Sequence, residues 1–222
     1  MEPAADDLPD FPSRVAATRT HAESGRPYRY FFIELLIVTA GVLIALSVDS
    51  LREWNQYRML VREARATIAR EIADNKKEVD SSLSEVEARK ANIRNAVTLA
   101  NDLLATRKSA IQEFRLGFSI AEVSSAGWQS ADRTGALSHM DYSEVQKYAR
   151  LYAFQELFAA QQRQAVQRIA SAIAILSDVN PHDAQPDDLR AFRQHLLALG
   201  GELDVERQLA ERLSGLYADA LK

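Results

Sequence analysis

The stretch FFIELLIVTAGVLIALSVDS, residues 31–50, decides how the rest of the chain is organised. From Phe31 to Val48 the only ionisable residue is Glu34. As a helix rising about 1.5 Å per residue, this run covers roughly 27 Å, close to the ~30 Å hydrocarbon core of a bilayer. Aromatic residues flank the run, as they do at membrane–water interfaces; they are Tyr28, Tyr30, Phe31, Phe32, Trp54 and Tyr57. We therefore predict a single transmembrane helix over residues 28–50.

Two other interpretations of this run are less favoured. Ala45-Leu46-Ser47 offers small residues of the kind found at signal-peptide cleavage sites. However, the segment before the run is long and acidic, and the helical pattern continues past Ser47 without a break. A buried core helix is disfavoured because the run is too long and too apolar for its flanks.

Glu34 admits two interpretations. It lies about one turn from the apolar edge, so its carboxylate can snorkel to the headgroups beside Arg29. Alternatively, Glu34, Gly41 and Ala45 lie on one stripe of the helix, and Gly41 with Ala45 forms a small-xxx-small step that lets a second helix approach. Both remain open, and we retain Glu34, Gly41 and Ala45 as a candidate membrane-helix contact. A proton pathway is disfavoured because one acidic residue on one helix makes no relay.

Helix-breaking residues are rare over most of the chain. No proline occurs between Pro27 and Pro181, and no glycine between Gly41 and Gly117. Tight turns and strand ends depend on these two residue types, so their absence favours long helices. Residues 1–27 instead hold four of the six prolines and no periodic apolar pattern. They are predicted to be a disordered tail.

Residues 51–222 are predicted to form a helical-bundle domain. From Tyr57 to Leu104, apolar residues, Leu83 among them, recur with a mean spacing of about 3.6 when Asn75 and Lys90 fill the gaps, as in an amphipathic helix. Further helices are expected over 119–133, 142–177, 186–200 and 203–220, with capping boxes at Ser119–Glu122 and Asp141–Glu144. The fold class is therefore all-α: a single N-terminal transmembrane helix continuing into an elongated antiparallel, coiled-coil-like helical bundle. We expect the juxtamembrane helix to pair antiparallel with helix 142–177.

The densest polar and aromatic cluster in the domain lies at a helix junction. Trp128, Gly135 and Leu137 are its candidate residues, and the cluster extends to Met140. One interpretation makes this corner a binding site for a small ligand or partner. The favoured interpretation is structural: Trp128, Leu137 and Met140 close the corner, and Gly135 supplies a left-handed turn.

No recognisable chemistry accompanies these elements. There is no cysteine, and the four histidines are scattered and lack carboxylates at metal-ligand spacing. The common hydrolase, nucleotide and dinucleotide motifs are missing from the sequence. The chain has a net charge of −4 and its basic residues are interspersed with acidic ones, so a nucleic-acid partner is also disfavoured. We expect no enzyme activity, no cofactor and no metal.

Two stretches resemble a family of small single-pass bacterial membrane proteins whose function is uncharacterised. The first is Ile33-Glu34-Leu35, followed by Gly41-Val-Leu-Ile-Ala-Leu46 and the exit Glu53-Trp54-Asn55. The second runs from Trp128 through Gly135 and Leu137 to Tyr152. Together they cover about a quarter of the chain, and Asp49-Ser50 stands where many relatives are asparagine-rich. The resemblance implies a membrane anchor followed by a helical domain, includes Glu34 in the family pattern, and implies no activity.

Three functions fit this organisation. We favour a membrane-anchored interaction or scaffold protein that meets a second copy, or a partner membrane protein, through its transmembrane helix. A sensor or regulatory subunit acting through a partner membrane protein is the alternative, and an enzyme with an unrecognised site is the least favoured. Arginines nearly balance across the run, so orientation is weakly determined. We expect the bacterial inner membrane, with the amino terminus in the cytoplasm and the helical domain in the periplasm.

Overall fold

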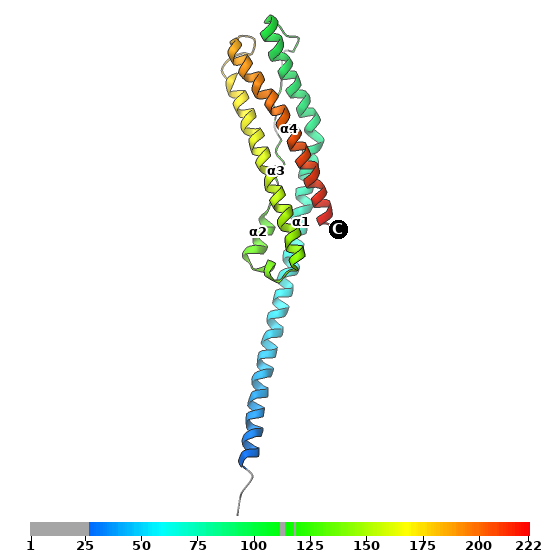
Figure 1. The fold of residues 1–222 in the computed structure, drawn as a ribbon, viewed down its shortest axis with the longest axis vertical. Helices are drawn as coiled ribbons and strands as arrows, with labels where there is room; N and C mark the ends of the chain where they lie inside the picture. Colours follow the sequence, from blue (N-terminus) through cyan, green and yellow to red (C-terminus); the bar gives the residue numbers. More distant parts are fainter. Residues whose placement is uncertain (1–26, 112–113, 118) are drawn as a thin grey trace, which may run out of the picture. The chain divides into compact units, whose positions relative to one another are not determined.

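The computed structural model describes residues 27–111, 114–117 and 119–222, so the predicted disordered tail lies outside the described residues apart from Pro27. The chain divides into two compact units, one ending at Arg52 and the other beginning at Glu53. Over the described residues every regular element is helical, which confirms the all-α prediction (Figure 1). The elements are α1 (Pro27–Thr106), α2 (Ala126–Arg133), the short 3-10 helix η1 (Ala136–His139), α3 (Tyr142–Ile175) and α4 (Pro186–Ala220).

The first unit contains the amino-terminal part of α1, up to Arg52. This part includes a segment long and apolar enough to cross a membrane, none of it buried by other described residues. The hydroxyls of Thr39 and Ser47 donate to the backbone carbonyl oxygens of Leu35 and Leu43, both at 2.7 Å. Such bonds satisfy hydroxyl groups within their own helix, as a lipid environment requires.

In the second unit the buried residues of α1 follow a strict heptad pattern. From Ile68 to Leu103 they recur at alternating steps of four and three residues. Leu99 is the one additional buried residue in this range. The seam residues are Ile68, Ile72, Asn75, Val79, Ser82, Val86, Arg89, Ile93, Ala96, Ala100 and Leu103. The period is therefore 3.5, typical of a left-handed coiled coil, instead of the predicted 3.6. As a result the seam passes through Ser82 and Arg89, where the sequence pattern favoured Leu83 and expected Lys90.

α4 carries the same repeat, with buried residues at alternating steps of three and four from Leu189 to Tyr217. The predicted helix end at Gly200-Gly201 is wrong, because α4 continues through both glycines. Leu199 and Leu203, on either side of them, are almost fully buried. Packing of the apolar seam therefore outweighs the low helix propensity of two glycines.

Side-chain pairs between helices establish the chain directions. The partners on α1 and α3 are separated by 79, 81 and 80 residues, so these two helices run parallel; they are Arg65–Glu144, Glu71–Tyr152 and Asn75–Gln155. Between α1 and α4 the numbers run in opposite senses, in the pairs Asp80–Ser214, Lys90–Asp204 and Asn101–Arg193. α4 is therefore antiparallel to α1. The predicted antiparallel pairing of the juxtamembrane helix with helix 142–177 is wrong.

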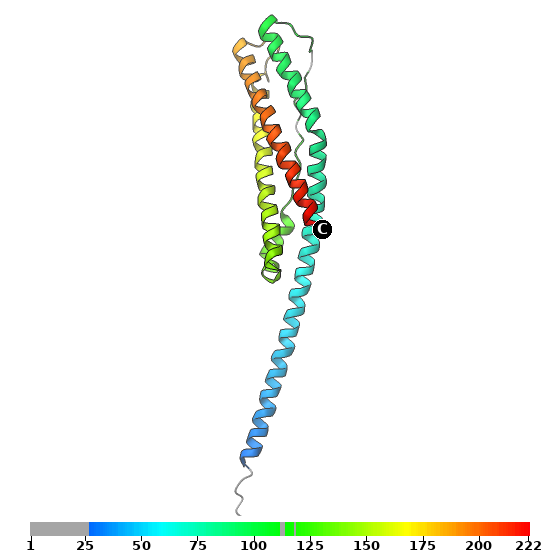
Figure 2. The same cartoon turned by 45° about the vertical axis from the view of Figure 1, so that its right-hand side comes forward.

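The chain returns from the end of α1 to the start of α3 without a long helix. α1 ends at Thr106, and Arg107 takes a left-handed φ of 59°. The described residues of 107–125, here called the return segment, contain no regular helix and lead back along α1 to α2 (Figures 1 and 2). The predicted helix over 119–133 is therefore wrong in its first half, since α2 begins only at Ala126.

The predicted helix starts near Tyr142 and Pro186 agree with the structure. The capping box predicted at Asp141 does not form, because Asp141 makes no side-chain capping bond. Glu144 instead receives the guanidinium of Arg65, with Nε at 2.8 Å and Nη2 at 2.6 Å. A contact between helices thus replaces a local one.

Candidate functional site

The predicted membrane-helix contact consists of exposed residues. Glu34, Gly41 and Ala45 all lie in the solvent-accessible part of α1 within the first unit. A Cβ atom added at Gly41 would meet no heavy atom within 4 Å. The stripe is therefore open to a second helix, and no described residue occupies it.

The predicted corner residues come together at α2 and η1. Gly135 precedes η1 with a left-handed φ of 75°, the conformation expected from the sequence. The ring of Trp128 stacks on Tyr152, with centroids 5.4 Å apart and planes at 18°. Leu137 packs against the hydrophobic cluster that contains buried Met140. Asp132 and Arg133 are exposed.

The corner is organised by a carboxylate that the sequence patterns did not single out. Glu71, on α1, accepts hydrogen bonds from the backbone N–H of Gly127 at 2.7 Å and from the hydroxyl of Tyr152 at 2.6 Å. The hydroxyl of Ser124 donates to the same carboxylate at 3.0 Å, and the N–H of Trp128 at 3.4 Å. Glu71 therefore caps the amino terminus of α2 from another helix, where a negative charge is favoured.

Gly127 makes this approach of backbone to carboxylate possible. A Cβ atom there would lie 3.1 Å from Cγ2 of Thr67 and 3.3 Å from Oε1 of Glu71. Both contacts are tighter than ordinary van der Waals distances, so a larger residue would push α2 away from α1.

Tyr152 acts in this cluster as a hydrogen-bond donor. Its burial raises the pKa of the phenol, and the hydrogen bond and negative charge of Glu71 raise that pKa further. The phenol therefore stays protonated at neutral pH and holds the carboxylate in place. A phenol with a raised pKa is a poor general base, so the arrangement favours a structural role over a catalytic one.

A second polar cluster holds the backbone of Ser124. The amide of Asn75 donates to the Ser124 carbonyl oxygen at 2.7 Å and accepts from its N–H at 2.8 Å. Gln155 donates to the same carbonyl at 3.0 Å, and the Tyr217 hydroxyl donates to Oε1 of Gln155 at 2.7 Å. α1 and α3 thus both bind the backbone of Ser124, and α4 holds Gln155 in place through Tyr217.

A similar arrangement holds Ala121, three residues before Ser124, and its partner Gln162 lies one heptad after Gln155 on α3. With its amide oriented to suit both groups, Gln162 donates to the Ala121 carbonyl at 3.2 Å and accepts from the Ala121 N–H at 3.0 Å. Arg89 donates to the Ser119 carbonyl at 3.4 Å. We call Asn75, Ser82 and Arg89 the polar seam, since each stands seven residues from the next on α1. A chain without its own ladder of hydrogen bonds needs such partners when it is buried.

Arg89 also belongs to a buried ion pair. Its Nη1 lies 3.4 Å from Oε1 of Glu206 on α4, and the two side chains are only 8% and 1% exposed. Nη2 donates to the carbonyl and hydroxyl oxygens of Ser82, at 2.9 and 3.0 Å. Burial raises the pKa of Glu206, and the charge and hydrogen bond of Arg89 oppose that rise.

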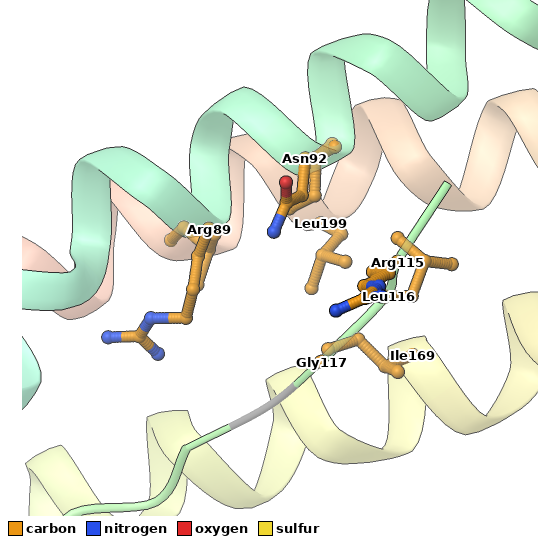
Figure 3. Close-up of a pocket in the computed structure, with 9 residues that line it drawn as sticks. Arg89, Asn92, Arg115, Leu116, Gly117, Ile169 and Leu199 are labelled. Atoms are coloured by element: carbon orange, nitrogen blue, oxygen red, sulfur yellow. The ribbon is translucent and has the colours of Figure 1, made fainter. Parts of the chain in front are cut away.

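Beside Arg89 the return segment leaves a cavity of about 10 Å³ between the long helices. Figure 3 shows Arg115, Leu116 and Gly117 crossing the space between Arg89 and Asn92 on α1 and Ile169 on α3. This volume is about that of one water-sized probe, too small for an organic ligand. Among the described residues, no group of three or more histidine, aspartate or glutamate side chains is placed to hold a metal ion.

Comparisons of the chain with protein-family models, with curated proteins and with solved structures gave no match.

Proposed function

We propose that this protein is a membrane-anchored helical interaction or scaffold protein without catalytic activity. One observation carries the proposal: buried polar side chains of the bundle such as Asn75 and Gln155 bond to each other and to the return segment, whereas the apolar helix of the first unit is uncovered. Glu71, Asn75 and Gln155 all bind the chain near Ser124. These three side chains are therefore occupied in holding the fold.

The proposed contact is the stripe of Glu34, Gly41 and Ala45, meeting a second copy of the chain or the helix of a partner membrane protein. Small residues let two helix backbones approach, and a carboxylate shielded by the partner can hydrogen-bond to it. We propose that the anchor lies in the bacterial inner membrane, with the helical unit in the periplasm.

Disulfide crosslinking tests the contact, because the chain has no cysteine of its own. With a single Val38→Cys reporter on the stripe, we expect a crosslinked dimer in membranes that decreases at least about fivefold on adding Glu34→Leu and Gly41→Leu. Leu36→Ile with Leu43→Ile, on the opposite face, is the matched control and should leave the yield unchanged. Equal yields in all three proteins would refute a self-contact through this stripe.

Reporters fused after Lys222 test the location. We expect activity from a reporter that works only outside the cytoplasm and none from one that works only inside, because long domains translocate largely regardless of charge. The opposite pattern would place the helical unit in the cytoplasm and contradict the proposed orientation. Recovery of soluble fusion protein would contradict the anchor itself.

A further inference from the structure

A groove of about 410 Å³ lies at the start of the second unit. Its lining residues are Trp54, Tyr57, Arg58, Val61, Arg62, Arg65 and His139, and we call it the arginine groove. Arg58, Arg62 and Arg65 follow one another at steps of four and three, so one face of α1 presents three guanidinium groups to the same space. His139 also lines the groove, and its ring stacks on Tyr57 with centroids 3.8 Å apart.

The charges of this groove are unequally compensated. Arg65 is paired with Glu144 through hydrogen bonds, and this bonding raises the pKa of the guanidinium. The guanidinium of Arg58 lies 4.5 Å from the ring centroid of Trp54, a cation–π contact that leaves its positive charge in place. No described carboxylate pairs with Arg58 or Arg62, and none lines the groove. The groove therefore attracts an anion.

Guanidinium groups bind phosphate oxygens through paired N–H donors, and the flanking aromatic rings suit the apolar part of a ligand. The groove lies close in the chain to the apolar run, and this position favours a lipid headgroup as the source of the phosphate. Trp54 follows Val48, the end of the apolar run, by six residues, and six residues span at most about 20 Å. Trp and Tyr are the residues that concentrate at the headgroup level of bilayers.

We propose that the arginine groove binds the phosphate of an anionic phospholipid headgroup, with Arg58 and Arg62 as the phosphate ligands and Trp54 and Tyr57 beside the glycerol and acyl carbons. This proposal rests on the proposed membrane anchor. In this proposal the first helical turns after the apolar run bind an individual lipid headgroup, in addition to being attracted to a negatively charged surface.

The test uses the full chain in non-ionic detergent micelles, to which phosphatidylglycerol or phosphatidylcholine is added. The chain has two tryptophans, so in a Trp128→Phe background Trp54 alone reports on the groove. We expect a saturable change in Trp54 fluorescence with phosphatidylglycerol and none with phosphatidylcholine. Each guanidinium near an anionic lipid strengthens its binding, so Arg58→Gln with Arg62→Gln should raise the midpoint at least about tenfold.

Arg150→Gln with Arg163→Gln is the matched control, since it removes two exposed arginines outside the groove. Its midpoint should equal that of the parent. A second measurement avoids the Trp128→Phe change: in the unaltered chain, phosphatidylglycerol should protect Arg58 and Arg62 from an arginine-specific reagent, while Arg150 stays reactive.

Three results would overturn the proposal: equal responses to the two lipids, an unchanged midpoint in the groove variant, or saturation by inorganic phosphate with no further change on adding lipid. The last would identify a site for free phosphate. Because the titration is done in detergent, it does not require residues 31–48 to span a bilayer. Failure of the groove and failure of the anchor are therefore observed separately.

Discussion

Replacing Arg89 with methionine should lower the free energy of unfolding of the helical unit by about 3–5 kcal/mol, because Glu206 would keep a buried charge without its partner. Both side chains are almost fully enclosed, at 8% and 1% exposure. Denaturant unfolding of the full chain in detergent, followed by far-UV circular dichroism, measures the loss.

Adding Glu206→Leu to Arg89→Met should recover at least half of that loss, since a buried ion pair replaced by apolar residues is often neutral or stabilising. Arg94→Met, on an exposed position of the same helix, is the control and should have little effect. A double variant as unstable as the sum of the two single variants would show that the two charges do not depend on each other.

The same variant should show a characteristic dependence on pH. Burial raises the pKa of Glu206 above its ordinary value of 4.5, and Arg89 opposes the rise. A carboxyl with a higher pKa in the folded chain binds its proton more tightly there, so the associated stability is complete below the unfolded pKa and is lost as pH rises through the folded one. Without Arg89 the folded pKa rises further. The stability difference between the parent and Arg89→Met should therefore grow as the pH rises above the ordinary pKa of a glutamate.

Glu71→Ala should destabilise the helical unit by about 3 kcal/mol, because hydrogen bonds to a charged acceptor contribute about 1.5–3 kcal/mol each and several donors would lose their partner together. The donors are the N–H of Gly127 and the hydroxyls of Tyr152 and Ser124. Since Trp128 stacks on Tyr152, its fluorescence should respond at lower denaturant concentration than the circular dichroism of the whole unit.

Glu78→Ala is the matched control, because Glu78 stands one heptad after Glu71 on α1 and is exposed. It should change the unfolding free energy by less than about 0.5 kcal/mol. If both alanine variants unfold together with the parent, Glu71 does not hold α2.

Local signals in the sequence predicted the long helices well. The scarcity of proline and glycine indicated α1 and α3, and Pro186 marked the start of α4. The left-handed conformation of Gly135 also followed from its position after a short helix. These features depend on neighbouring residues, so a single sequence contains the information needed to predict them.

Local signals could not predict which residues of α1 are buried in the seam. A search for apolar residues selects Leu83 over Ser82, because nothing nearby indicates that a serine faces the core. The buried guanidinium of Arg89 has its partners in the Ser119 carbonyl of the return segment, in Glu206 on α4 and in Ser82, seven residues earlier on α1. Residues 119–125 bond to these distant side chains and form no helix, contrary to the prediction.

Glu71 escaped prediction for a related reason. Its partners Ser124 and Tyr152 lie 53 and 81 residues away, and its spacing on α1 resembles that of any solvent-facing glutamate. The parallel direction of α1 and α3 was missed because the length of the connection did not show whether it returns along the helix. Both depend on contacts distant in sequence.

The return segment also sets the order in which a newly made chain can finish folding. Residues 107–125 leave the ribosome soon after α1, when α1 alone is present to bind them, through residues such as Glu71, Asn75 and Arg89. Tyr217, which completes the cluster around Gln155, follows Ser124 by 93 residues. At about 5–20 residues per second, translation takes on the order of 5–20 s to cover that distance. During this time part of the apolar seam of α1 stays accessible to chaperones and proteases. If the ribosome stalled before Tyr217, the nascent chain could not complete the hydrogen bonds around Gln155.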